Sequence, residues 1–151
     1  MDKNIWGTTI WYFFHTIAEK ILPEKFNELK PAILEMTSII FSNLPCPECA
    51  THAREEFKRI NQQNIKNKED LITLYWEFHN RVNKRLNKQE FSREELSKYK
   101  TANLKAIYNN FNIVYNAGSG YNEKLLGDAL QRRIQNKQLY GLINTIISHC
   151  I

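Results

Sequence analysis

Leu44-Pro45-Cys46-Pro47-Glu48-Cys49-Ala50-Thr51-His52 is the stretch around which the chain is organised, because it places two cysteines at the predicted start of a helix. Pro45 ends the preceding helical pattern, since proline disfavours helical geometry in the residue before it. Pro47 suits the first position of the next helix, where its missing N–H is not needed. We therefore expect Cys46 at the N-cap and Cys49 at the third helical position, near free N–H groups that favour a thiolate.

This Cys-x-x-Cys pair allows three interpretations. The first is a redox-active disulfide, because cysteines at this spacing close the small ring used in thiol–disulfide exchange. The second is a metal site in which Cys46, Cys49, His52 and a distant histidine are the ligands. The third is a pair of inert thiols. The two cysteines alone do not choose among them.

The composition is that of one small globular domain, with 151 residues of which 42% are hydrophobic and 25% charged. The net charge of +5 comes from scattered basic residues, which favours solvated helix faces over a nucleic-acid interface. No apolar run approaches the roughly 20 residues that a membrane-spanning helix needs. We expect neither a nucleic-acid partner nor a membrane span.

The N-terminal residues and the cysteine count favour a reducing compartment. The apolar stretch 5–14 follows Asp2 and Lys3, and no small-residue cleavage site comes after it, so we expect no signal peptide. Three cysteines are an odd number and do not make a disulfide framework. We therefore expect a cytoplasmic protein, in which a Cys-x-x-Cys pair is more often catalytic or metal-binding than structural.

Apolar residues at helical spacing predict four main helices. The first runs to about residue 21 with Thr8 or Thr9 as its cap, and Pro31 opens the second at its first position. The third and fourth span residues 46–60 and 69–86. Helices that are apolar on one side bury that side together, so the pattern predicts a helical bundle.

Shorter helical patterns follow the fourth helix. They cover residues 93–99 and 104–111, and residues 111–115 form the one stretch that is compatible with a β-strand. A single short strand cannot form a sheet within this pattern. The fold class that we expect is therefore all-α.

A run with linker composition, 116–120, precedes a last apolar segment that Asn122 could cap and Gly141 could bend or divide. We expect two parts in the chain. Residues 1–115 form the helical bundle, and residues 116–151 form a linker and a C-terminal helical extension. Because the apolar stripe of the extension must be covered, we expect it to pack on the bundle or on a second subunit.

Two predicted helix faces carry groups that suit a planar ligand. On the fourth helix, Trp76, His79 and Asn83 share one face and combine an indole, an imidazole and an amide. On the first helix, Trp11 and His15 are four residues apart and also share a face. Stacking rings with directed hydrogen-bonding groups fit a heteroaromatic ligand, although each face taken alone is more often structural.

Three motifs in order carry a family resemblance. They are Trp6-Gly-x-x-x-Trp11-x-x-x-His15, Cys46-x-x-Cys49-x-x-His52 and Trp76-x-Phe-His79-Asn80-x-Val82-Asn83-x-x-Leu86-x-Lys88. With these motifs the chain resembles the Erv/ALR family of FAD-linked sulfhydryl oxidases over roughly residues 5–100. The resemblance implies a four-helix bundle that holds FAD, a short fifth helix, and a homodimer.

The resemblance also implies the site residues. Cys49 is similar to the family's cysteine that faces the flavin, and Cys46 to the one that exchanges with incoming thiols. Trp11 and His15 resemble flavin contacts, whereas the matched residues of the fourth helix lie on the adenine and phosphate side. His52 receives no role. The implied cofactor contacts are Gly7, Trp11, His15, His79, Asn80, Asn83, Lys88 and Tyr99, and no metal is implied.

The implied reaction oxidises a substrate dithiol through a mixed disulfide at Cys46, and electrons pass from Cys49 through FAD to molecular oxygen, giving hydrogen peroxide. The rival function is a zinc-stabilised helical interaction module with Cys46, Cys49, His52 and His79 as ligands. Yellow flavin absorbance against stoichiometric zinc would distinguish the two.

Cys150 is the one cysteine outside the pair, so the structural disulfide and the shuttle pair of many cellular members are both missing. This lone cysteine could be half of a shuttle with a partner subunit, a link between two chains, or inert, and we expect it to be inert. The compact form resembles most the oxidases of large cytoplasmic DNA viruses, which implies a place in the host cytosol, a virus factory or the virion. The implied substrates are a small dithiol carrier or viral and cellular protein thiols.

Overall fold

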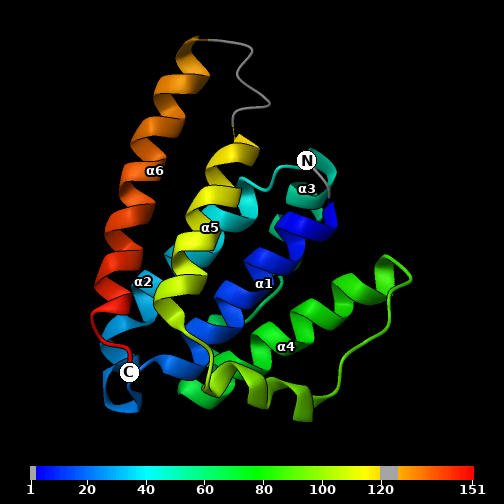
Figure 1. The fold of residues 1–151 in the computed structure, drawn as a ribbon, viewed down its shortest axis with the longest axis vertical. Helices are drawn as coiled ribbons and strands as arrows, with labels where there is room; N and C mark the ends of the chain where they lie inside the picture. Colours follow the sequence, from blue (N-terminus) through cyan, green and yellow to red (C-terminus); the bar gives the residue numbers. More distant parts are fainter. Residues whose placement is uncertain (1–2, 120–125) are drawn as a thin grey trace.

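A computed structural model describes residues 3–119 and 126–151, and both ranges are built from helices (Figure 1). In chain order the elements are α1 (Lys3–Lys20), η1 (Pro23–Lys25), α2 (Phe26–Ser42), α3 (Pro47–Lys58), η2 (Gln62–Asn64), α4 (Lys68–Arg85), η3 (Arg93–Lys100), α5 (Leu104–Ser119) and α6 (Leu126–Ile147). The predicted all-α fold is confirmed. Helices α1 to α4 are the four main helices, η3 is the short fifth helix, and α5 and α6 follow it.

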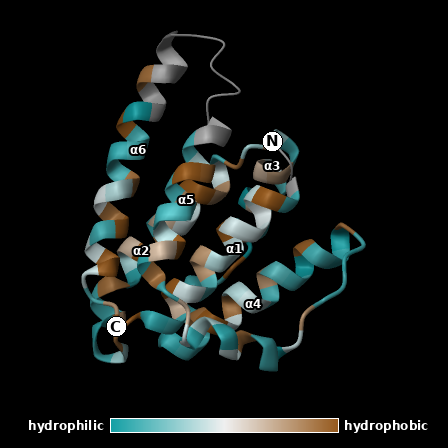
Figure 2. Cartoon of the chain, viewed as in Figure 1, coloured by the Kyte–Doolittle hydropathy of each residue, from teal (hydrophilic) through white to brown (hydrophobic). Residues whose placement is uncertain are grey.

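Helix α1 is the central helix of the core. It contacts α4, α5 and η3, while α2 contacts α3 and α6 (Figure 1). Phe13, Phe14 and Ile17 of α1 are fully buried, and each such side chain contributes about 1.5–3 kcal/mol when it leaves water. Apolar and polar residues alternate along the helices, as Figure 2 shows, so each helix turns one side toward this core.

Among the helices in the described ranges, none is long and apolar enough to cross a membrane.

Two predicted helix starts are wrong. α1 begins at Lys3, and the Thr9 hydroxyl does not cap it but donates to the Ile5 carbonyl oxygen at 2.9 Å, one turn back within the helix. α2 begins at Phe26, so Pro31 lies inside the helix and not at its first position. The start is earlier because Phe26 belongs to the buried apolar stripe of α2 and the turn η1 leads directly into it.

The C-terminal helices also differ from the pattern predicted for them. The stretch 111–115 lies within α5 and not in a strand, because Phe111 and Tyr115 face the core four residues apart with ring centroids 5.1 Å from each other. α5 continues to Ser119, so the predicted linker begins inside a helix. α6 passes through Gly141 without a break.

The predicted cap Asn122 lies outside the described residues. α6 packs on α2 and buries Leu139, Ile143 and Ile146 completely, whereas Ile134 remains 59% exposed. The described part of the extension therefore covers the bundle of its own chain. The division of the chain at residue 116 and a role for a second subunit stay predictions.

The end of the chain is hydrogen-bonded to the junction between α1 and α2. The backbone N–H of Leu22 donates to the carbonyl of His149 at 3.0 Å, and the N–H of Ile151 donates to the carbonyl of Lys20 at 2.9 Å. These two bonds flank an isolated antiparallel bridge between residues 21 and 150. Segments at opposite ends of the sequence are thus joined by backbone contacts.

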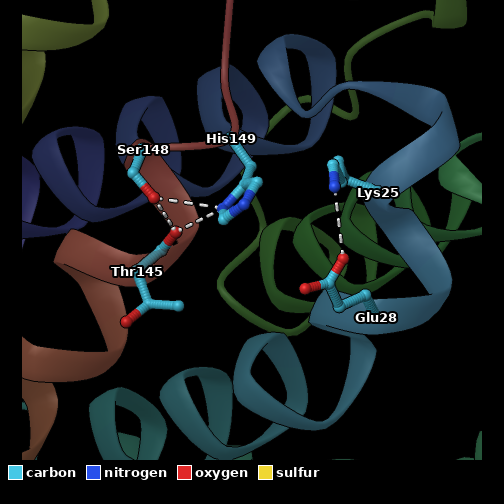
Figure 3. Close-up of polar contacts among 5 residues, drawn as sticks. All are labelled: Lys25, Glu28, Thr145, Ser148 and His149. Carbon is cyan, nitrogen blue, oxygen red and sulfur yellow. Dashed lines mark hydrogen bonds and ion pairs between the residues drawn. The ribbon is translucent and has the colours of Figure 1, made fainter.

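The side chains drawn in Figure 3, which lie near this junction, make local polar contacts. The His149 Nδ1 lies 3.0 Å from both the Thr145 carbonyl oxygen and the Ser148 hydroxyl. Lys25 and Glu28 form an exposed ion pair at 3.5 Å. Such a pair contributes at most about 1 kcal/mol, so the backbone contacts and the buried part of α6 hold this end in place.

Candidate functional site

A cavity of about 280 Å³ opens between α1, α3, α4 and η3. The predicted site residues that line it are Gly7, Trp11, Cys49, His79, Asn83, Lys88 and Tyr99. Three predicted residues, Cys46, His15 and Asn80, lie outside the lining. The structure therefore brings one cysteine of the pair and the ring-bearing faces of α1 and α4 to one space.

The cysteine pair has the local geometry that the sequence predicts. Cys46 is the N-cap of α3 with extended backbone, Pro47 follows at the first turn, and the Cys46 Sγ accepts a hydrogen bond from the Cys49 N–H at 3.3 Å. An N–H aimed at sulfur stabilises negative charge on it. Cys49 lines the cavity and Cys46 does not, so the two sulfurs have different surroundings.

An aromatic cluster stands at the wall of the cavity, and its rings Trp11, His79 and Tyr99 are among the lining residues. Trp11 stacks flat on His79, with centroids 4.3 Å apart and 8° between the ring planes. His15 lies behind them, 2% exposed, and its Nε2 is 3.0 Å from the Nδ1 of His79. Tyr99 stacks on His15 at 4.8 Å. His79 of the face predicted on α4 thus joins the Trp11 and His15 face of α1, whereas Trp76 of the α4 face does not line the cavity.

Both imidazoles of this cluster are neutral. Burial, followed by the neighbouring His79 and Lys98, lowers the pKa of His15 from 6.5 to about 3. Burial also lowers the pKa of His79 to about 3, with Lys98 and Lys88 as the next causes. Two neutral rings can share one N–H···N bond, because one ring donates and the other accepts.

Basic and amide groups line another part of the cavity. Asn83 and Lys88 are there as predicted, and Arg85 and Lys98 join them. The Lys98 Nζ lies 5.2 Å from the ring centroids of Tyr12 and of Tyr99, and the Lys88 Nζ donates to the Asn4 side-chain oxygen at 2.9 Å. A group of cations beside aromatic faces suits a ligand that has both a flat ring and phosphates.

The end of α4 explains how Lys88 comes to the cavity. Asn87 has a φ of 56°, in the left-handed region, and directly follows the last helical turn. The N–H of Lys88 donates to the carbonyl of Asn83 at 2.8 Å, and the N–H of Asn87 donates to that of Lys84 at 3.2 Å. This pair of bonds is the Schellman motif, which ends a helix and turns the chain sharply.

Gly7 lines the cavity, and the protein itself does not require a glycine there. A Cβ atom added at residue 7 would have no heavy atom within 4 Å. A side chain at this position would therefore occupy cavity space and not clash with the fold. This agrees with the predicted close approach of a ligand to the backbone of α1.

Asn80 has a different place from the one predicted for it. It is 8% exposed, and its side chain makes two hydrogen bonds of 3.0 Å to the backbone of Phe91, one as donor and one as acceptor. Its assignment as a cofactor contact stays a prediction. His52 is half-buried and does not line the cavity.

The zinc alternative gains no support from the described residues. Within 3–119 and 126–151, no three histidine, cysteine or acidic side chains lie close enough together to hold a metal ion. His79, the distant ligand of that alternative, is instead engaged with Trp11 and His15.

Sequence reasoning missed Arg85, Lys98 and Phe91. Arg85 and Lys98 are among the scattered basic residues, although Lys98 directly precedes the predicted contact Tyr99 and Arg85 is two residues after Asn83. Those positions were the available signal. Phe91 carries no signal in the sequence, because only the folded chain brings it to the histidines.

The known proteins that this chain resembles are named as FAD-linked sulfhydryl oxidases. The chain is 27% identical over 93 residues to a protein of Invertebrate iridescent virus 3 that is provisionally named a FAD-linked sulfhydryl oxidase, covering 61% of this chain and 63% of the relative. It is 30% identical over 96 residues to the FAD-linked sulfhydryl oxidase ERV1 of Arabidopsis thaliana, covering 64% of this chain and 50% of the relative. The FAD-linked sulfhydryl oxidase of African swine fever virus is 31% identical over 103 residues, covering 68% of this chain and 86% of the viral protein.

The chain spans less than two thirds of the length of the iridescent virus and plant relatives. No solved structure gives a significant match. The profile of the Erv1 / Alr family matches residues 8–118, which include every residue that lines the cavity from Thr8 onward. Since this match covers most of the sequence, the chain belongs to the Erv1 / Alr family.

Proposed function

We propose that this chain is a FAD-linked thiol oxidase that forms disulfides in protein dithiols through a Cys46–Cys49 redox disulfide. The observation that carries the proposal is that Cys49, from the start of α3, lines the same cavity as Trp11 and His79. The names of the plant and viral relatives support the same activity. The overall reaction is 2 R-SH + O2 → R-S-S-R + H2O2.

The donor set of the cavity fits FAD. The rings of Trp11 and His79 offer faces for stacking, Asn83 offers an amide, and the open space at Gly7 admits a flat group close to the backbone. Lys88, with Arg85 and Lys98, supplies positive charge for the diphosphate. Bound FAD would accept an electron pair from the cysteine pair and pass it to oxygen as hydrogen peroxide.

The chain's own cysteines carry the exchange with substrate. A substrate thiolate attacks the Sγ of Cys46, the Cys46–Cys49 bond breaks, and Cys49 leaves as a thiolate. The second substrate thiolate then attacks the substrate sulfur of the mixed disulfide, so Cys46 leaves and the substrate departs as a disulfide. Two electrons remain on the cysteine pair. The Cys49 N–H, 3.3 Å from the Cys46 Sγ, stabilises negative charge on the sulfur that leaves last.

The proposed substrates are a small dithiol carrier or viral and cellular protein thiols. The chain has no second cysteine pair that could relay electrons from a bulky substrate, so we propose that the substrate reaches Cys46 directly. A homodimer and a place in the host cytosol, a virus factory or the virion complete the proposal. The viral relatives support the place in the cell, and the homodimer rests on the family resemblance alone.

Cys49→Ser tests the proposal. The purified wild-type protein should be yellow and should consume oxygen when given a dithiol. The variant should retain FAD, because its side chain is nearly isosteric, and should lose oxygen uptake completely because no sulfur faces the cavity. Absorbance of the bound flavin and an oxygen electrode measure the two properties. Dithiol reduction of the flavin in the variant, or a colourless wild type with bound zinc, would contradict the proposal.

A further inference from the structure

Two side chains of α4 form hydrogen bonds with the backbone of Phe91. The Trp76 Nε1–H and the Asn80 amide N–H both donate to the Phe91 carbonyl oxygen, at 3.1 Å and 3.0 Å. The Asn80 side-chain oxygen accepts from the Phe91 N–H at 3.0 Å. The single donor of the indole and both ends of the amide are therefore directed at one residue, eleven positions or more along the chain.

The ring of Phe91 is thereby set against the histidine pair. Its centroid lies 4.6 Å from that of His79 and 5.4 Å, edge-on, from that of His15. The same two imidazoles share the 3.0 Å nitrogen–nitrogen contact. An N–H···N bond weakens steeply when the rings rotate, so a neighbour that restricts their rotation preserves it.

Phe91 also ends the segment that begins at the left-handed residue Asn87 and carries Lys88. One end of that segment is fixed by the Schellman motif, and the other is fixed by Trp76 and Asn80. The contacts of Trp76 and Asn80 with Phe91 therefore fix both the ring beside the histidine pair and one end of the segment that carries Lys88.

We propose that Asn80 is a positioning residue. It acts through Phe91 to keep the His15 and His79 rings in the orientation of their nitrogen–nitrogen contact at the cavity wall, and it does not contact a ligand directly. Where it concerns FAD the proposal rests on the proposed function, but the state of the histidine pair does not depend on that function. Trp76 serves the same purpose through its bond to the Phe91 carbonyl.

Asn80→Leu and Phe91→Leu separate the steps of this arrangement. Asn80→Leu removes both amide bonds, whereas Phe91→Leu retains the backbone bonds and removes the ring. Tyr75→Phe is the matched control, because it removes a buried 2.7 Å hydrogen bond to Thr37 in the core, outside the cavity lining. We expect all three variants to lose stability and only the first two to disturb the histidines.

The first readout is the imidazole N–H signal of the His15–His79 bond, observed by NMR in the purified protein. It should be present in wild type and Tyr75→Phe, and absent or rapidly exchanging in Asn80→Leu and Phe91→Leu. The second readout is the dissociation constant for FAD, which should rise about tenfold in Asn80→Leu and Phe91→Leu, because the histidine pair at the cavity wall is no longer held in place.

A protected imidazole N–H in Asn80→Leu, or the same FAD affinity in Asn80→Leu and Tyr75→Phe, would overturn the positioning role. If Asn80→Leu does not fold, Phe91→Leu decides by the same two readouts. If wild type takes up no flavin, the proposed function fails, and the NMR readout alone still decides the role of Asn80.

Discussion

Cys46 and Cys150 differ in the backbone groups around their sulfurs. Cys46 lies at the start of α3 and its sulfur accepts a backbone N–H. The Cys150 Sγ follows the end of α6 and donates to the Ile146 carbonyl oxygen at 3.4 Å. Burial raises the pKa of Cys150 to about 11, although Lys68 and Lys20 act in the opposite direction. A thiol among carbonyl groups stays protonated, and a protonated thiol is a poor nucleophile.

Cys150→Ser should therefore leave dithiol oxidation unchanged. In the reduced wild-type protein, iodoacetamide at pH 8 should modify Cys46 well before Cys150, because about one Cys150 in a thousand is ionised there. Mass spectrometry of peptides after timed quenching measures the two rates. Equal rates, or loss of turnover in the variant, would show that Cys150 is not inert.

The histidine pair predicts how stability depends on pH. The pKa values of His15 and His79 are about 3 in the folded protein and 6.5 when unfolded. The contribution of the two neutral histidines to the free energy of unfolding is therefore fully present above pH 6.5. It is lost as the pH falls toward 3, by up to about 1.4 kcal/mol per pH unit for each histidine. Urea unfolding between pH 7 and pH 5 measures this slope.

The double variant His15→Gln/His79→Gln should have a flatter slope, and His149→Gln, outside the cavity, should retain that of the wild type. A steep slope in the double variant would assign the pH dependence to other groups.

The sequence predicts those site residues that act through their type and spacing. Cys49, Trp11 and His79 meet at the cavity because helical periodicity places them on inward faces. Asn80 is next to His79 in sequence but points about 100° away around the helix, where Phe91 meets it. Which chain segment lies there depends on tertiary contacts that local patterns do not encode.

Among the elements, α4 has both of its ends defined by asparagine. The Asn67 side chain caps the start by accepting the Asp70 N–H at 2.9 Å. Asn87 ends the helix in the left-handed region, which asparagine tolerates better than most residues. The predicted span 69–86 is close to the observed one because these signals are local.

Asn87→Val should destabilise the protein by about 1–2 kcal/mol, since a β-branched residue resists the left-handed conformation. Asn87→Gly should be nearly neutral, because glycine adopts a positive φ freely. Urea unfolding of the two variants measures the difference. Equal stability of the valine and glycine variants would show that this turn relaxes without cost.

The start of α2 shows where local signals fail. Pro31 is a common first residue of helices, yet α2 begins at Phe26 and includes it. An internal proline removes one backbone hydrogen bond. Burial of Phe26 and Leu29, each 2% exposed, offsets that loss, and this burial depends on the rest of the fold.

In the whole molecule, α6 covers α2 and closes the core from outside. Ile143→Ala should lower stability by about 2–4 kcal/mol, because it opens a cavity at a fully buried position. Ile134→Ala on the same helix should change it by less than about 0.5 kcal/mol, since that side chain is 59% exposed. Thermal or urea unfolding measures both, and similar losses would mean that Ile134 is covered in solution, as by a second subunit.

The position of α6 on α2 affects synthesis of the protein in the cell. The buried residues of α6 leave the ribosome about a hundred residues after α2 does, which takes roughly 5–20 s at ordinary rates of translation. During that interval the nascent chain presents the apolar outer side of α2 to the solvent. Chaperones that bind exposed apolar segments therefore have a defined target on this chain until its last helix docks.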